Sequence, residues 1–202
     1  SRPDIQDRLA ARDTHSLLQQ LLAKERYNAI HIEGLEMASY APTIRRMASN
    51  YGSPKLIYDA HNAETIIQLR AFATDVRDPR RWPQALYSLL QLPRLRRFER
   101  ATCDIVDKVL CVSHEDANAL RQLTPGLKPV LVPNGLFLSD YDSPPQAASL
   151  PPCSLVFSGK MNYRPNVDAA VWFAEKIFPR ILTRLNTSAE FVIVGKEPTE
   201  RV

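Results

Sequence analysis

The chain has 202 residues, of which 45% are hydrophobic and 24% charged, and its formal net charge is +4. This composition excludes a mostly disordered chain and provides for one full domain and part of a second. No apolar run approaches the roughly 18 residues of a membrane span. The three cysteines are too irregularly spaced for a disulfide framework or a metal site, so we expect a reducing, cytoplasmic setting and no metal.

The first half of the chain alternates between helical and extended patterns. Apolar residues at helical spacing predict helices at 5–26 and 39–50. Short β-branched or apolar segments predict strands at 28–33 and 55–60. A long, mainly helical region follows at 63–103. Prolines predict interruptions of the last region near Pro79, Pro83 and Pro93.

The alternation is clearest between residues 107 and 132. Residues 107–112 have the pattern of a buried strand, and 113–116 (SHED) predict a capping box that opens a helix to Leu123. Residues 128–132 predict the next strand. Strands separated by helices form βαβ units, so the sequence predicts an α/β fold with a Rossmann-like, doubly wound parallel sheet covered on both faces.

A change of composition then divides the chain. Residues 138–153 are rich in Ser, Asp, Ala and Pro, which is typical of a linker. A second βαβ unit is predicted from a strand, a helix and a strand at 154–158, about 166–184 and 190–194. We expect an N-terminal domain over 1–137 that lacks its first strand, and the truncated start of a C-terminal domain over 154–202.

Polar residues gather at the end of the strand at 55–60 and directly after it, namely Asp59, His61, Asn62 and Glu64. Ligands of open parallel sheets bind beyond the carboxyl ends of the strands. Such groups hold sugar hydroxyls by paired hydrogen bonds, and an imidazole carries a proton near neutral pH. We therefore predict a substrate site here, with His61 as the catalytic residue. The alternative is that Asn62 merely caps the next helix.

Asn134 follows the strand at 128–132 in a Pro-Asn-Gly sequence. Asn-Gly is first a turn signal. Because this turn leads into the linker, Asn134 is also a candidate substrate-binding residue.

The loop after the strand at 154–158 has features of a phosphate site. Gly159 lets backbone approach a ligand closely, and the helix that follows offers N–H groups at its N-terminus. Lys160 and Arg164 add positive charge, and Asn166 completes the predicted diphosphate-binding set. The loop matches neither G-x-G-x-x-G nor a P-loop, and an ordinary strand-to-helix connection is the alternative.

Positive charge concentrates in residues 70–100, with eight arginines against three acids. Leu92, Leu95 and Phe98 interleave with the arginines of 94–100, a pattern that fits a helix at a membrane surface. The alternative is a solvated helix face. No nucleic-acid-binding fold signature is present, and we expect no nucleic-acid partner.

Several motifs follow one another in a particular order: 58–64 (YDAHNAE), 109–113 (VLCVS), 132–135 (VPNG), 157–168, 172–179 (WFAEKIFP) and 191–195 (FVIVG). In these motifs the chain resembles group 1 glycosyltransferases of family 4. Within that family it is most similar to bacterial sugar transferases of polysaccharide or cell-envelope synthesis.

The resemblance implies a GT-B architecture, in which two Rossmann-like domains face a cleft. It implies metal-independent transfer with retention of anomeric configuration, from a nucleotide-diphosphate sugar and without a cofactor. The acceptor would be a glycan or a lipid-linked sugar, and the enzyme would be cytoplasmic or bound to the inner membrane face through 94–100. By position, His61 resembles the family's histidine near the reacting centre. Gly159 and Lys160 resemble the element that holds the donor diphosphate, and Asn166 stands where many members have a second lysine.

The family's paired glutamates lie later in the second domain, and the chain does not include them. The resemblance therefore predicts an internal fragment without transferase activity of its own. Two other classes stay open: a non-catalytic Rossmann-like binding or regulatory module, and a peripheral membrane-binding domain centred on 94–100.

Overall fold

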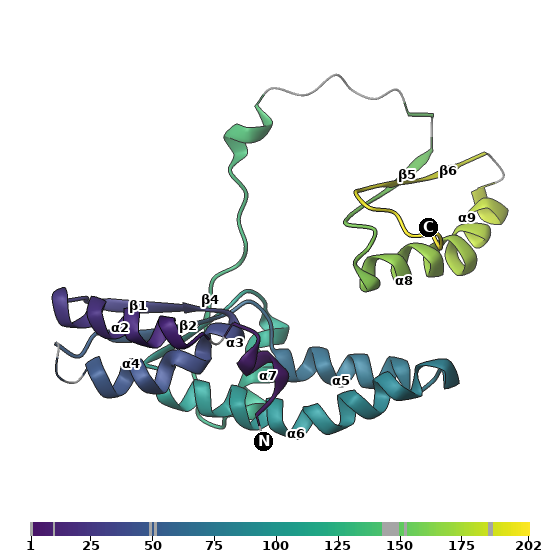
Figure 1. The fold of residues 1–202 in the computed structure, drawn as a ribbon. Coiled ribbons are helices and arrows are strands. Elements are labelled where there is room, and N and C mark those ends of the chain that lie inside the picture. The colour runs from purple at the N-terminus through teal and green to yellow at the C-terminus, as the bar shows by residue number, and fades with distance from the viewer. Residues whose placement is uncertain are drawn as a thin grey trace. The chain divides into compact units, whose positions relative to one another are not determined.

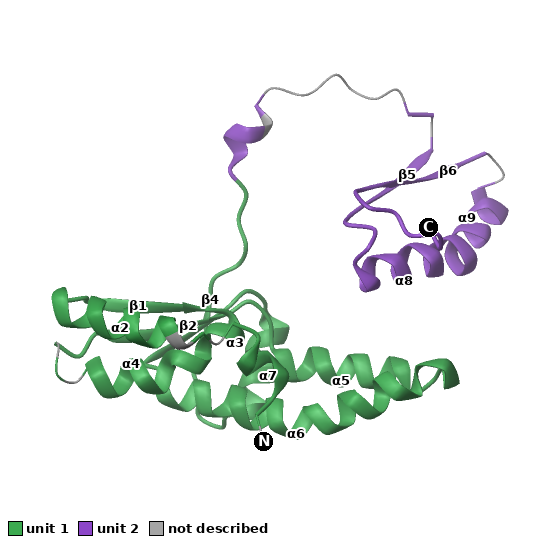
Figure 2. Ribbon diagram, viewed as in Figure 1, with its two compact units in different colours: residues 1–136 green, residues 137–202 purple. Residues whose placement is uncertain are grey.

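The computed structural model describes residues 2–9, 11–48, 50, 52–142, 150–151, 153–185 and 188–202. The chain divides into two compact units, residues 1–136 (unit 1) and 137–202 (unit 2), as Figure 2 shows. Of the linker predicted over 138–153, residues 143–149 and 152 lie outside the described residues, and a 3-10 helix occupies Leu138–Tyr141.

A four-stranded parallel sheet in the order β1-β2-β3-β4 is the frame of unit 1 (Figure 1). Its strands are β1 (Ala29–Glu33), β2 (Lys55–Ala60), β3 (Lys108–Cys111) and β4 (Val130–Leu131). Its helices are α1 (Asp4–Asp7), α2 (Arg12–Lys24), α3 (Gly34–Met37), α4 (Ala41–Ala48), α5 (Glu64–Asp75), α6 (Trp82–Ile105) and α7 (His114–Leu123). The predicted α/β fold with a parallel, helix-flanked sheet is confirmed.

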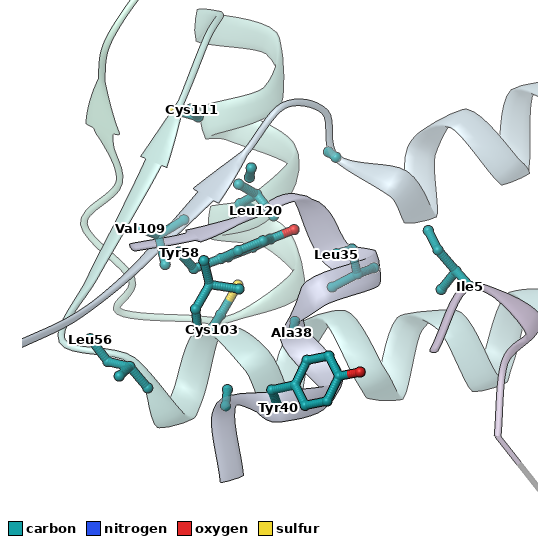
Figure 3. Packing of buried hydrophobic residues seen from close by; sticks show 14 of the residues in the cluster. Ile5, Leu35, Ala38, Tyr40, Leu56, Tyr58, Cys103, Val109, Cys111 and Leu120 are labelled. Atoms are coloured by element: carbon teal, nitrogen blue, oxygen red, sulfur yellow. The ribbon is translucent and has the colours of Figure 1, made fainter. Parts of the chain in front are cut away.

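The core of unit 1 lies against one face of this sheet (Figure 3). Every second residue of β2 is fully buried, namely Leu56, Tyr58 and Ala60. Parallel pairing places Ile32 of β1 and Val109 of β3 beside Tyr58. Because side chains alternate between the two faces of a strand, these residues share one face and pack on the helices.

The opposite face of the sheet is more open. His31 of β1 is exposed, and Ile57 and Asp59 of β2 are half-buried. The sequence predicts cover on both faces, whereas burial is concentrated on one. The second face therefore leaves polar side chains in contact with solvent close to the carboxyl end of β2.

The helix predicted over 5–26 is divided into α1 and α2. The buried hydroxyl group of Tyr40 accepts a hydrogen bond from the Ala11 N–H at 2.9 Å and donates one to the Leu9 carbonyl oxygen at 2.8 Å. These backbone groups are thus paired with a side chain at the break between the two helices.

Helices α5 and α6 pack side by side and extend beyond the sheet (Figure 1). The predicted interruptions near Pro79 and Pro83 coincide with the break between α5 and α6. Pro83 lies in the first turn of α6, where its missing N–H group has no helical partner to lose. Pro93 lies inside α6, and the helix continues to Ile105. The interruption predicted near Pro93 is therefore wrong.

Unit 2 is a βαβ arrangement in the order that the sequence predicts. It contains β5 (Ser154–Ser158), α8 (Arg164–Trp172), a π-helical segment (Phe173–Ile177), α9 (Phe178–Leu185) and β6 (Glu190–Val194). β5 and β6 pair in parallel, from Ser154 opposite Glu190 to Ser158 opposite Val194. Met161, Val167 and Ala170 are buried beneath them.

Candidate functional site

The loop between β2 and α5 is held by two carboxylates from distant parts of unit 1. Glu99 of α6 accepts hydrogen bonds from the backbone N–H groups of Glu64 and Thr65, at 2.7 and 3.0 Å. Asp116 of α7 accepts one from the Ala63 N–H at 2.9 Å. The first N–H groups of a helix have no partner within it, so these carboxylates satisfy three of them and fix the start of α5.

Glu99 is fully buried, and burial raises the pKa of its carboxyl group. Hydrogen bonds from Thr65 and Glu64 oppose this shift of the pKa. The positive end of the α5 dipole also favours the ionised form. The N-cap position belongs to Ala63, so the alternative that Asn62 caps α5 is wrong. A buried carboxylate from another helix takes that role.

The four candidate residues at the end of β2 occupy different positions: Asp59 belongs to β2, and the other three follow it. His61 and Asn62 are exposed on the loop, and Glu64 is half-buried in the first turn of α5. Burial raises the pKa of Glu64, with Glu36 and Glu99 adding to the shift, while a hydrogen bond from Asn62 opposes it. The side chains of Asn62 and Glu64 therefore interact through a hydrogen bond.

Asp59 has a different neighbour, which the sequence did not indicate. Its Oδ2 atom lies 3.2 Å from Nε2 of His31 on β1, and both side chains are partly exposed. The two residues belong to adjacent strands on the more open face of the sheet. They form an imidazole–carboxylate pair on that face, and Asp59 precedes His61 by two residues.

Asn134 is exposed beyond the end of β4. In the sheet order, β3 lies between β2 and β4. Asn134 and His61 therefore follow strands that are not neighbours in the sheet.

In unit 2, Gly159 and Asn166 are explained by a close approach. A Cβ atom on Gly159 would lie 2.7 Å from Nδ2 of Asn166, whose amide donates to the Lys160 carbonyl oxygen at 3.1 Å. The Gly159 N–H donates to the Val194 carbonyl oxygen at 3.0 Å. The backbone N–H of Gly159 is thus paired with β6, and the side chain of Asn166 holds the loop through its hydrogen bond to Lys160.

The cations of this loop have acidic neighbours. The Lys160 ammonium lies 3.4 Å from Oε2 of Glu197, which follows β6 and also accepts a hydrogen bond from Asn162. Arg164 pairs with Asp168 one turn further along α8. Lys160 is 62% exposed at its side chain, so its ammonium is open to solvent, and an anion would compete with Glu197 for it.

The segment 94–100 differs from its predicted form. The side chains of Arg96, Arg97 and Arg100 are exposed. Leu95 is buried and Phe98 packs against the core, which contradicts their predicted place at a membrane surface. Both side chains lie on the inward face of α6 and stabilise the fold by packing in the core.

Within the described ranges, no group of three or more His, Cys, Asp and Glu side chains is arranged to hold a metal ion. No helix in that part of the chain combines the length and apolar character needed to cross a membrane.

Comparison with known proteins gives one match. A family model described as Glycosyltransferase Family 4 matches residues 2–139, a range that includes the whole sheet of unit 1, the His61 loop and its two anchoring carboxylates. No curated protein and no solved structure matches the chain.

Proposed function

Because the chain belongs to glycosyltransferase family 4, we propose that it works in a GT-B-type enzyme that transfers a sugar from a nucleotide-diphosphate donor to a glycan or lipid-linked acceptor. The transfer retains anomeric configuration and needs neither a metal nor a cofactor. The observation that carries this proposal is the family match over residues 2–139. The acceptor class follows from the resemblance to bacterial polysaccharide and cell-envelope transferases.

His61 is the residue that we assign to the sugar near its reacting carbon. Its exposed ring lies beyond the carboxyl end of β2, where ligands of parallel sheets bind. An imidazole offers one donor and one acceptor to sugar hydroxyls. The hydrogen bonds that Glu99 and Asp116 accept at the start of α5 hold the loop in place, and a fixed position is what orientation of a reacting group requires.

Lys160 is the residue that we assign to the donor diphosphate. Breaking the bond between a sugar and a diphosphate builds negative charge on the leaving group, and a fixed cation stabilises this charge. The exposed ammonium group of Lys160 supports the assignment, with Glu197 as the anion that it exchanges for the diphosphate.

The test is turnover by the gene's natural product against a panel of radiolabelled nucleotide-diphosphate sugars with glycan and lipid-linked acceptors. We expect transfer from one nucleotide class, undiminished by a metal chelator. The anomeric proton coupling of the product, measured by NMR, should match that of the donor. Absence of transfer from every donor would sink the proposal, and an inverted product would remove the retaining mechanism alone.

A further inference from the structure

Helix α6 exposes large apolar side chains along its outer face. Leu86 follows Trp82 by four residues, and Leu89 and Leu90 follow Leu86 by three and four; each of these side chains is at least half exposed. Residues at this spacing share one face of a helix. These four side chains are the apolar half of what we term the outer stripe of α6.

The inward face of the same helical turns is polar or small. Ala85, Ser88 and Gln91 are buried there. Ser88 accepts a hydrogen bond from Gln68 at 2.7 Å, and Gln91 donates one to Asp4 at 2.8 Å. A surface helix normally directs its apolar residues to the core and its polar residues to water. In this part of α6 the arrangement is inverted, so the outer stripe is matched to an apolar medium outside the unit.

The stripe continues into a basic half toward the C-terminal end of α6. Arg96, Arg97 and Arg100 are exposed and follow the same helical spacing. The one acid on this part of the face is Asp104, whose Oδ2 atom lies 3.9 Å from Nε of Arg100. Positive charge therefore predominates at this end of the stripe.

Two surface hollows adjoin the basic half. One, of about 390 Å³, is lined by three arginines, one acid and two small apolar residues: Arg96, Arg97, Arg100, Asp104, Pro93 and Ala101. The other, of about 420 Å³, is lined by Arg2, Arg94 and Arg97 among others. Arg97 borders both. Guanidinium groups around a concave surface fit phosphate oxygens by paired, charge-assisted hydrogen bonds.

We propose that the outer stripe of α6 docks unit 1 on an anionic phospholipid bilayer. The apolar half enters the headgroup–acyl boundary, where a tryptophan and leucines lose contact with water, and the basic half binds lipid phosphates. The two halves together favour a bilayer over another protein, because a bilayer surface offers anionic phosphates and hydrocarbon in adjacent layers. Docking is independent of sugar transfer, so its test needs no donor or acceptor.

The experiment measures co-sedimentation of the 202-residue chain with vesicles of phosphatidylcholine alone and of phosphatidylcholine mixed with phosphatidylglycerol. We expect binding to the mixed vesicles and weak binding to the neutral ones. A basic side chain at an anionic surface strengthens binding about fivefold. The triple variant Arg96→Gln, Arg97→Gln, Arg100→Gln should therefore lower the partition coefficient about 100-fold. Its charge-matched control Lys24→Gln, Arg26→Gln, Lys128→Gln should change it no more than about threefold.

The apolar half has its own matched pair of variants. Leu86→Ser, Leu89→Ser, Leu90→Ser should also lower the partition coefficient at least about 100-fold. The control Leu9→Ser, Leu17→Ser, Leu21→Ser removes three leucines that are exposed elsewhere on unit 1 and should leave binding unchanged. All these side chains are exposed, and circular dichroism melting verifies that each variant is folded.

Tryptophan fluorescence tests the placement directly. The chain has two tryptophans, so Trp172→Phe leaves Trp82 as the only emitter. Its emission should shift to the blue on mixed vesicles and be quenched by brominated lipids. The proposal is overturned if emission of the bound protein does not change or if stripe variants bind like the parent. Equal binding to neutral vesicles overturns it too, as does sedimentation equilibrium showing that the leucines instead join two copies of the chain.

Discussion

At the scale of single residues, Glu99 connects the fold to the candidate site. Its carboxylate is fully buried in unit 1 and accepts hydrogen bonds from the backbone N–H groups of Glu64 and Thr65. Glu99→Ala leaves both donors without a partner, and we expect the free energy of unfolding to fall by about 2–4 kcal/mol. Urea unfolding followed by circular dichroism at neutral pH measures this loss.

The control for Glu99 is Glu115→Ala. Glu115 is exposed in the first turn of α7, where a carboxylate interacts only with the helix dipole, so its removal should cost less than about 1 kcal/mol. Equal losses in the two variants would show that Glu99 is not the anchor of the His61 loop.

A second residue-scale prediction is that Glu197 limits the affinity of Lys160 for anions. The two side chains form an exposed ion pair at 3.4 Å, and such pairs contribute little, so the gain from removing one is small. Glu197→Gln should raise the affinity for pyrophosphate up to about fivefold, measured by titration calorimetry. Adding Lys160→Ala should abolish the gain. An equal gain from Glu190→Gln, an exposed acid at the start of β6, would contradict the assignment.

At the scale of elements, Asp107 joins β2, β3 and α4. Its Oδ2 atom accepts hydrogen bonds from the Leu56 N–H at 2.7 Å and from Arg45 at 2.8 Å. The Leu56 hydrogen bond and Arg45 lower the pKa of Asp107. At neutral pH we expect Asp107→Asn to lower the free energy of unfolding by about 1–3 kcal/mol.

The pH dependence of this loss has a definite sign. Because the pKa of Asp107 is lower in the folded state, its contribution is complete above the ordinary aspartate pKa of about 3.9 and is lost as pH falls through the folded value. The difference between parent and Asp107→Asn should therefore be constant from pH 8 to about pH 5 and shrink below about pH 4. A difference that stays constant down to the acid transition would refute the mechanism.

Pro93 is the second element-scale feature, since it lies inside α6 without ending it. It cannot donate the backbone hydrogen bond that a helix expects at this position. Its ring lies on the exposed face, so Pro93→Ala should restore the bond without disturbing the core. We expect the melting temperature to rise, with a gain of about 1–3 kcal/mol in the free energy of unfolding. A lower melting temperature would mean that a bend at Pro93 is needed for packing of Leu95.

At the scale of the whole molecule, local patterns were sufficient to predict the strands and the alternation of elements. β2 coincides with the strand predicted over 55–60, because a short apolar run between Lys55 and Asp59 marks it within six residues. α6 could not be bounded in this way. Its tertiary packing overrides the signal of Pro93, and the apolar side chains of Leu86 and Leu90 are exposed.

The candidate site was predictable only in its local part. His61 is the first residue after β2 and Lys160 the second after β5, where a sequence pattern identifies them. Glu99 and Asp116 act on residues far away in the chain, and the His31–Asp59 pair depends on the register of two strands. No pattern within one segment contains these relations, since they arise from packing.

We propose that the chain takes part in sugar transfer with His61 at the reacting centre. The turnover number of His61→Ala in the gene's natural product tests this most directly. The comparison is His114→Ala, which changes an exposed histidine of unit 1 at the start of α7. We predict that His61→Ala lowers kcat about 100-fold or more and that His114→Ala leaves it unchanged. Equal turnover in both variants would contradict the claim.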